Sequence, residues 1–196
     1  MRTHNTNLVA LVEGAVMVAM GWVLDYLCSL IPFDAILPFG GSISLGVVPL
    51  VYFSYRRGWG WGLGAGIVYA GIQMLMSFYV PPAGTFLALV LCIFLDYAVY
   101  GVMGLADLFA RPFGKRRLLG YGVAGALVNL IRMVCGILSG VILWADYAPE
   151  GMNLWVYSIV YNASYMIPNA ILTAVSVVLL ARLADPKTLR PMRKAS

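Results

Sequence analysis

Charged side chains are scarce in this chain. Only 11% of its 196 residues are charged and 62% are hydrophobic, whereas soluble domains carry about 25% charged residues. The mean hydropathy is +0.87. This composition excludes an ordinary soluble protein and predicts an integral membrane protein whose core is the bilayer-spanning bundle itself.

Residues that carry out catalysis or bind metals are scarcer still. His4 is the only histidine, and the three cysteines, Cys28, Cys92 and Cys135, lie in or beside apolar runs without metal-binding spacing. The chain has no HExxH motif, no GxxxxGK[ST] phosphate loop and no plausible Ser–His pair. We therefore predict that the protein is not an enzyme, does not hydrolyse ATP, and needs no metal or cofactor.

The long apolar runs predict an all-α protein with six transmembrane helices in a single domain, residues 1–196. A full helical crossing needs about 20 residues, so the short second span is expected to be extended by residues 39–42 or to be partly buried in the bundle. The third span is rich in glycine, which favours close packing of helices. The predicted spans are 8–30, 43–55, 58–79, 84–110, 118–144 and 155–184.

The basic residues fall on one side of these spans. The opposite side carries Asp34, Asp146 and Glu150 without any lysine or arginine. By the positive-inside rule both termini are cytoplasmic, and the clusters reflect membrane topology rather than nucleic-acid binding. Every lysine and arginine except Arg132 belongs to the cytoplasmic set: Arg2, Arg56, Arg57, Arg111, Lys115, Arg116, Arg117, Arg182, Lys187, Arg190, Arg193 and Lys194.

Asp96 lies in the predicted span 84–110 and is the only charged residue between Thr85 and Leu105. A charge at such a depth costs roughly 2.5–3.5 kcal/mol on insertion scales, which makes it a candidate functional residue. The alternative is a structural pair with another buried polar group. Arg132, the one basic residue inside a span, could neutralise Asp96 or pair with Glu13 or Asp107.

Aromatic side chains gather near the outer ends of the fifth and sixth spans: Trp144, Trp155, Tyr157, Tyr161 and Tyr165. The three tyrosines are four residues apart and share a helical face. An interfacial belt explains Trp155, but the deeper tyrosines and Asn162 are better explained by a site, with Asn162 facing the interior. Aromatic rings with a carboxylate suit a small, flat, cationic ligand.

Short segments spread along nearly the whole chain resemble one known family, the thiamine-specific substrate-binding (S) components of energy-coupling factor (ECF) transporters, known as ThiT. Each segment is weak alone, and their order and spacing carry the resemblance. The segments are 13–19, 41–45 with Pro49, 56–58, 95–97, Ser139-Gly140 with Trp144, 147–151 and 157–162.

The resemblance implies a six-helix subunit of the bacterial plasma membrane that captures thiamine from outside the cell. Uptake would need a separate transmembrane coupling protein, which Ala15 and Ala19 would face, and two cytoplasmic ATPases. Asp96 would address the aminopyrimidine and Trp144 would stack on the ligand. The positions that match or adjoin the family's binding residues are Asp96, Tyr97, Gly136, Gly140, Trp144, Tyr157, Tyr161 and Asn162.

The chain departs from the family pattern at two of these positions. Gly136 stands where the family usually has histidine, which removes a polar contact and is expected to leave room, and Asp96 stands where it usually has glutamate. The first outer loop, 31–42, also contains no tryptophan. An S component for another heterocycle, such as a thiamine precursor or another vitamin, is therefore an alternative. A structural or regulatory membrane protein with an Asp96–Arg132 strut is a third hypothesis.

Overall fold

The computed structural model describes residues 2–32, 37, 41–77, 86, 99, 101, 112–113 and 117–183. These residues form helices and connecting segments, and no strand occurs among them. Asp96, Tyr97 and Asp107 lie outside the described residues. The helices are α1 (Arg2–Ser29), α2 (Val48–Arg57), α3 (Trp59–Ser77), α7 (Arg117–Leu143), the short 3-10 helix η5 (Ala145–Tyr147) and α8 (Leu154–Leu183).

Three of these helices are long and apolar enough to cross a membrane: Thr6–Ser29, Leu118–Leu143 and Leu154–Leu183. They correspond to the first, fifth and sixth predicted spans. Their outward faces carry large apolar side chains, such as Leu11, Leu138 and Ile171. Such faces suit contact with lipid, so the membrane-bundle prediction is confirmed, while the full set of six helices stays a prediction.

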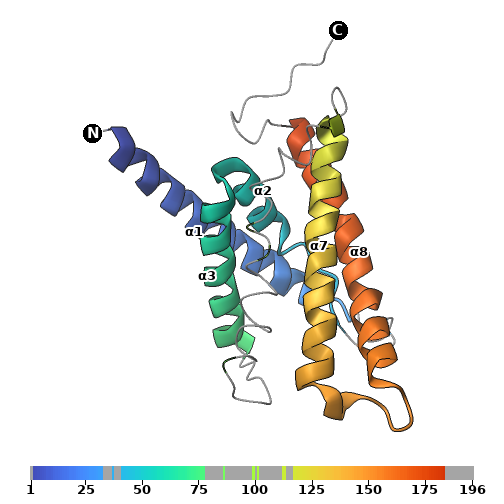
Figure 1. The fold of residues 1–196 in the computed structure, drawn as a ribbon. Helices are drawn as coiled ribbons and strands as arrows, with labels where there is room; N and C mark the ends of the chain where they lie inside the picture. The colour runs from blue at the N-terminus through green and yellow to red at the C-terminus, as the bar shows by residue number, and fades with distance from the viewer. Residues whose placement is uncertain are drawn as a thin grey trace.

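The long helices α7 and α8 run antiparallel and side by side, and α1, α2 and α3 pack together next to them (Figure 1). One end of the bundle holds the first residues of α1 and α7 and the last residues of α8 (Figure 1). The chain also passes from α2 into α3 at this end. The opposite end holds η5 and the start of α8. This arrangement agrees with termini on one side of the membrane, although the side itself stays a prediction.

Helix α2 is short because its ends are fixed by sequence. Pro49 stands in its first turn, and Gly58 caps its end with φ 97° while donating from its backbone N–H to the Ser54 carbonyl at 2.8 Å. Residues 41–47 are not helical, so the expected extension by residues 39–42 is wrong for Gly41 and Ser42. The alternative is confirmed, because most residues of α2 are buried.

Two apolar clusters meet at α2. The first joins Val47, Val51 and Tyr55 to α7 and α8, and the Tyr55 and Tyr121 ring centroids lie 4.4 Å apart. The second joins Leu50 and Phe53 to α1 and α3. The remaining buried members are Tyr121, Ala124, Val128, Val177 and Ala181 in the first cluster, and Val18, Ala65 and Tyr69 in the second.

Glycines let these helices approach closely, as small residues do in membrane bundles. A Cβ atom on Gly14 of α1 would lie 2.9 Å from the Phe53 ring, and one on Gly62 of α3 would lie 2.0 Å from Ser54 Oγ. The predicted close packing of the glycine-rich third span is thus confirmed at Gly62, whereas a Cβ atom on Gly60, Gly64 or Gly71 would meet no described atom within 4 Å.

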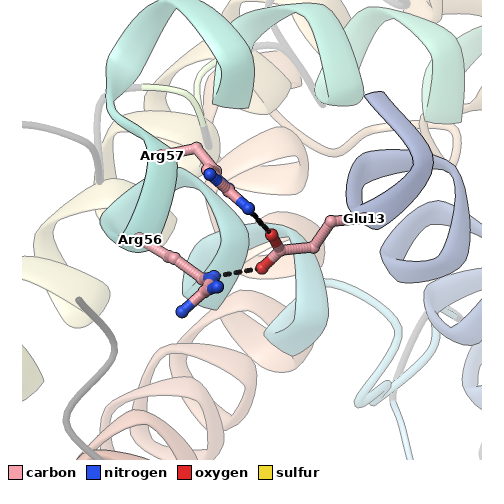
Figure 2. A network of polar contacts seen from close by, with 3 residues as sticks. All are labelled: Glu13, Arg56 and Arg57. Carbon is pink, nitrogen blue, oxygen red and sulfur yellow. Dashed lines mark hydrogen bonds and ion pairs between the residues drawn. The ribbon is translucent and has the colours of Figure 1, made fainter. Parts of the chain in front are cut away.

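Both acidic residues of α1 have partners on neighbouring helices. Glu13 is paired with Arg56 and Arg57 of α2, and Arg57 Nε donates to Glu13 Oε2 at 2.7 Å (Figure 2). Near the other end of α1, Asp25 accepts a hydrogen bond from Gln73 of α3. Half-buried charges are expensive unless paired, so these contacts hold α1 against α2 and α3.

Candidate functional site

The buried face of α8 is polar over much of its length. Ser158, Asn162, Asn169 and Thr173 are each at most 3% exposed, and spacings of four, seven and four residues put them on one helical face. Toward Leu183 the same face becomes apolar at Val177 and Ala181. Buried polar side chains within a membrane span mark functional sites, so this stripe is the candidate site.

Two glycines of α7 lie directly against this stripe. A Cβ atom on Gly140 would be 2.3 Å from Ser158 Oγ, and one on Gly136 would be 2.4 Å from Asn162 Oδ1. Ser158 Oγ in turn donates to the Ile137 carbonyl at 2.8 Å. The room expected beside Gly136 is therefore filled, because the Asn162 amide occupies the space that a side chain at 136 would need.

The Asn162 amide is held at both of its polar atoms. Nδ2 donates to the Ser158 carbonyl at 2.9 Å, and Oδ1 accepts from the Tyr165 hydroxyl at 3.0 Å. The prediction that Asn162 faces the interior is confirmed. Nδ2 also lies 3.5 Å from Ser158 Oγ. An amide oxygen has two acceptor lone pairs, so Oδ1 can accept a second hydrogen bond besides the one from Tyr165.

The aromatic face predicted for α8 is confirmed. The ring centroids of Tyr157 and Tyr161 lie 6.1 Å apart with the planes 26° from parallel, and those of Tyr161 and Tyr165 lie 5.4 Å apart in an edge-on arrangement. All three rings are half-buried. Trp155 is half exposed, as expected for a residue of the interfacial belt.

Trp144 follows directly after α7, where its backbone N–H donates to the Gly140 carbonyl at 3.3 Å. Its ring is half-buried and lies edge-on to Tyr147, with centroids 5.3 Å apart. The end of α7 and the start of α8 lie at the same end of the bundle (Figure 1). Trp144 and Tyr157 therefore belong to the same end of the α7–α8 pair.

The segment before α2 is attached to the same face of α8. Asn169 accepts from the Ser44 backbone N–H at 2.9 Å and donates to the Ser42 carbonyl at 3.0 Å. Gly41, with φ 101°, lies so close to Tyr165 that a Cβ atom would be 2.6 Å from the ring.

Sequence reasoning missed Ser158 and Asn169 as parts of the site. Asn169 lies seven residues after Asn162, which is two helical turns along one face, and this spacing of two amides in an apolar span was the available signal. Ser158 lies four residues before Asn162, and its hydroxyl was the second signal. Asn169 also follows Pro168, a residue that leaves a backbone carbonyl of a helix unpaired.

The other predicted residues lie as follows. Ala15 and Ala19 are exposed on α1, while Ala10, Gly14 and Val18 of the same helix are buried. Arg132 is half-buried in α7; Asp96 and Asp107, two of its predicted partners, lie outside the described residues. The third, Glu13, is paired with Arg56 and Arg57. In the part of the chain that the structure describes, no three His, Cys, Asp or Glu residues gather as a metal site would need.

The fold and the buried polar stripe define a multi-pass helical membrane protein. The chain belongs to the thiamine transporter protein family, whose model matches residues 11–189. This is a family of plasma-membrane transporters rather than of enzymes, as the scarcity of catalytic residues predicted.

Two relatives and one solved structure agree with this assignment. The chain is 29% identical to the thiamine transporter ThiT of Bacillus subtilis over 90% of its own length and 92% of the relative. It is 27% identical to ThiT of Lacticaseibacillus paracasei, covering 94% and 92%. The structure of ThiT from Listeria monocytogenes is similar in fold, with a TM-score of 0.68 and 18% identity over 90% of this chain and 95% of that one.

Proposed function

We propose that this protein is the substrate-binding subunit, or S component, of an ECF-type importer and that it captures thiamine from outside the cell. The observation that carries the proposal is the buried amide of Asn162, held by Ser158 and Tyr165 beside a face of tyrosine rings. Membership of the thiamine transporter family supports the identity of the ligand.

The chemistry of thiamine suits the side chains of this region. Its thiazolium ring is cationic and flat, and a desolvated cation–π contact contributes about 2 kcal/mol or more. Trp144, Tyr157 and Tyr161 supply rings for such contacts. The aminopyrimidine has donor and acceptor edges, for which we propose Asn162 and Asp96 as partners. Tyr97 beside Asp96, and Gly140, which has no side chain to obstruct the ligand, complete the proposed site.

The site is proposed to open to the outside, with both termini in the cytoplasm. Arg57 and Arg182 lie in the last turns of α2 and α8, whereas Asp146 and Glu150 lie in the connection between α7 and α8. This distribution supports an orientation in which the α7–α8 connection is extracellular. The connections 31–42 and 145–154 would then close over the bound ligand.

We propose that transport itself depends on other proteins. The sequence contains no phosphate loop, so ATP would be hydrolysed by two separate cytoplasmic ATPases. A transmembrane coupling protein would dock on α1 at Ala15 and Ala19. Their exposure and small size support this assignment, because small side chains let a second helix approach closely in a membrane.

A second candidate substrate is another small heterocycle, such as a thiamine precursor. It is favoured by Gly136, which stands where histidine is usual in the family. The close contact between Gly136 and Asn162 would give this chain a differently shaped pocket from that of a histidine-bearing relative. The third hypothesis, a non-transport protein, does not fit a chain that belongs to a transporter family.

Titration of the detergent-purified protein with thiamine, followed by tryptophan fluorescence, tests the proposal. We expect sub-micromolar quenching that is lost in Asp96→Asn and retained in Glu150→Gln, which removes an exposed acid. A response to pyrimidine precursors or other vitamins without one to thiamine supports the second candidate. No response to any of these ligands by a folded protein contradicts both.

A further inference from the structure

Tyr165 is held in place from three directions. Its hydroxyl contacts Asn162 Oδ1 at 3.0 Å, its ring lies edge-on to Tyr161, and Gly41 packs against the ring with no room for a Cβ atom. A tyrosine fixed in this way keeps its hydroxyl in one position. The hydroxyl that donates to Asn162 therefore stays in place if the Asn162 side chain moves.

The direction of each hydrogen bond at Asn162 follows from its partners. The Ser158 carbonyl can only accept, so the NH₂ group of Asn162 must face it. The amide oxygen must then face Tyr165, whose hydroxyl donates its proton. Without that hydroxyl, Oδ1 would lose its donor and only the contacts of Nδ2 with Ser158 would hold the amide, so the amide oxygen would no longer point in one fixed direction.

The segment before α2 supports Tyr165 from the other side. Asn169 binds both Ser42 and Ser44 through its amide, and the two bonds tie residues 42–44 to α8. Gly41 is the next residue along the chain, and its φ of 101° suits glycine. Asn169 thus holds the segment at the position where its backbone contacts the Tyr165 ring.

We propose that Tyr165 is a positioning residue that fixes the direction of the Asn162 amide oxygen, while the Ser158 carbonyl holds the NH₂ side, and that Asn169 supports Tyr165 by holding Gly41 against its ring. An amide oxygen fixed in this way accepts from the exocyclic amine of an aminopyrimidine and disfavours the carbonyl of an oxopyrimidine, so Tyr165 sets the preference of the site between these two ring edges. The proposal rests on the proposed function. It assigns the ligand selectivity of that site to Tyr165, which acts through Asn162.

Thiamine and oxythiamine, which differ in this one exocyclic group, are the probes. Tyr165→Phe keeps the ring and removes the hydroxyl, and we expect it to weaken thiamine binding about five- to twentyfold. The ratio of the two dissociation constants should move toward one. In an Asn162→Ala background Tyr165→Phe should change neither constant. Tyr26→Phe, on the exposed face of α1, is the matched control and should leave both constants unchanged.

The outcomes separate this proposal from the proposed function. If the wild-type protein does not bind thiamine, the proposed function fails and this proposal with it. If it binds thiamine and Tyr165→Phe leaves the affinity and the ratio unchanged, only this proposal is overturned. If Tyr165→Phe weakens thiamine binding as much in the Asn162→Ala background as in the wild-type protein, Tyr165 contacts the ligand directly, and this result also overturns the proposal. If Tyr165→Phe does not fold, Asn169→Ser should shift the ratio the same way, and an unchanged ratio overturns the proposal.

Discussion

Gly136 and Asn162 share a single space between α7 and α8. A Cβ atom at 136 would lie 2.4 Å from Asn162 Oδ1, a distance that real Cβ atoms essentially never show. The close approach of the two helices and the buried amide therefore depend on each other, and neither residue can be changed without an effect on the other.

Gly136→Ala is expected to destabilise the protein by about 1–3 kcal/mol, because overpacking forces a backbone shift or a displaced side chain. Gly136→His, which introduces the usual family residue, should cost at least as much and should weaken thiamine binding by displacing Asn162. Thermal unfolding in detergent and thiamine titration measure the two effects. Leu138→Ala, at a partly exposed position of the same helix, is the control with a smaller effect. Unchanged melting of Gly136→Ala would contradict the contact.

Glu13→Gln is expected to destabilise the protein by about 1–3 kcal/mol, since hydrogen bonds to charged groups contribute that much. The substitution leaves Arg56 and Arg57 close together with no carboxylate between them (Figure 2). The free energy of unfolding should recover in part when Arg57→Gln is added to Glu13→Gln. Glu150→Gln, which lies exposed outside any helix, should leave the unfolding temperature unchanged. Equal unfolding temperatures of Glu13→Gln and Glu150→Gln would argue against the ion pairs.

Asn169→Ala removes both hydrogen bonds that tie residues 42 and 44 to α8. We expect faster amide hydrogen exchange over residues 41–47, because this segment loses its attachment while α8 remains. Asn129→Ala is a matched control, since Asn129 is an equally buried amide that donates to the Gly125 carbonyl within α7. The prediction is wrong if exchange over residues 41–47 is the same in both variants.

Ala15→Trp and Ala19→Trp are expected to abolish thiamine uptake while leaving thiamine binding intact. Both positions are exposed on α1, so a large side chain there would obstruct a partner helix without disturbing the interior. Uptake by whole cells and titration of the purified protein give the two measurements. Ile171→Trp, on an exposed face of α8, tests whether any outward tryptophan has this effect. Normal uptake by both alanine variants would remove the assignment of a docking face.

The sequence predicted the features that depend on local pattern. Hydropathy located α1, α7 and α8, and the four-residue spacing of Tyr157 and Tyr161 indicated their shared face. Asn162 was expected to face inward because an amide in lipid needs a partner, and it does. Each of these arguments uses residues within one helix.

Features that depend on contacts between distant segments could not be predicted in this way. The bond between Ser44 and Asn169 joins residues 125 positions apart, and no local pattern distinguishes it. Glu13 was given Arg132 as one candidate partner, whereas Arg56 and Arg57 bind it, because helix packing decides which basic residue is near. The same holds for Gly136, whose neighbour is set by the closeness of α7 and α8.

Leu50 and Val51 are consecutive residues of α2, both completely buried, and they belong to different apolar clusters. One extra residue inserted in the first turn of α2 would turn each by about 100° around the helix axis and remove both from their clusters at once. Connecting segments usually tolerate insertions and deletions. Residues 41–47 lead into α2 and are held at both ends. The hydrogen bonds between Asn169 and residues 42 and 44 hold one end, and the packing of Leu50 and Val51 in their clusters holds the other. Natural length variation among relatives should therefore avoid this segment.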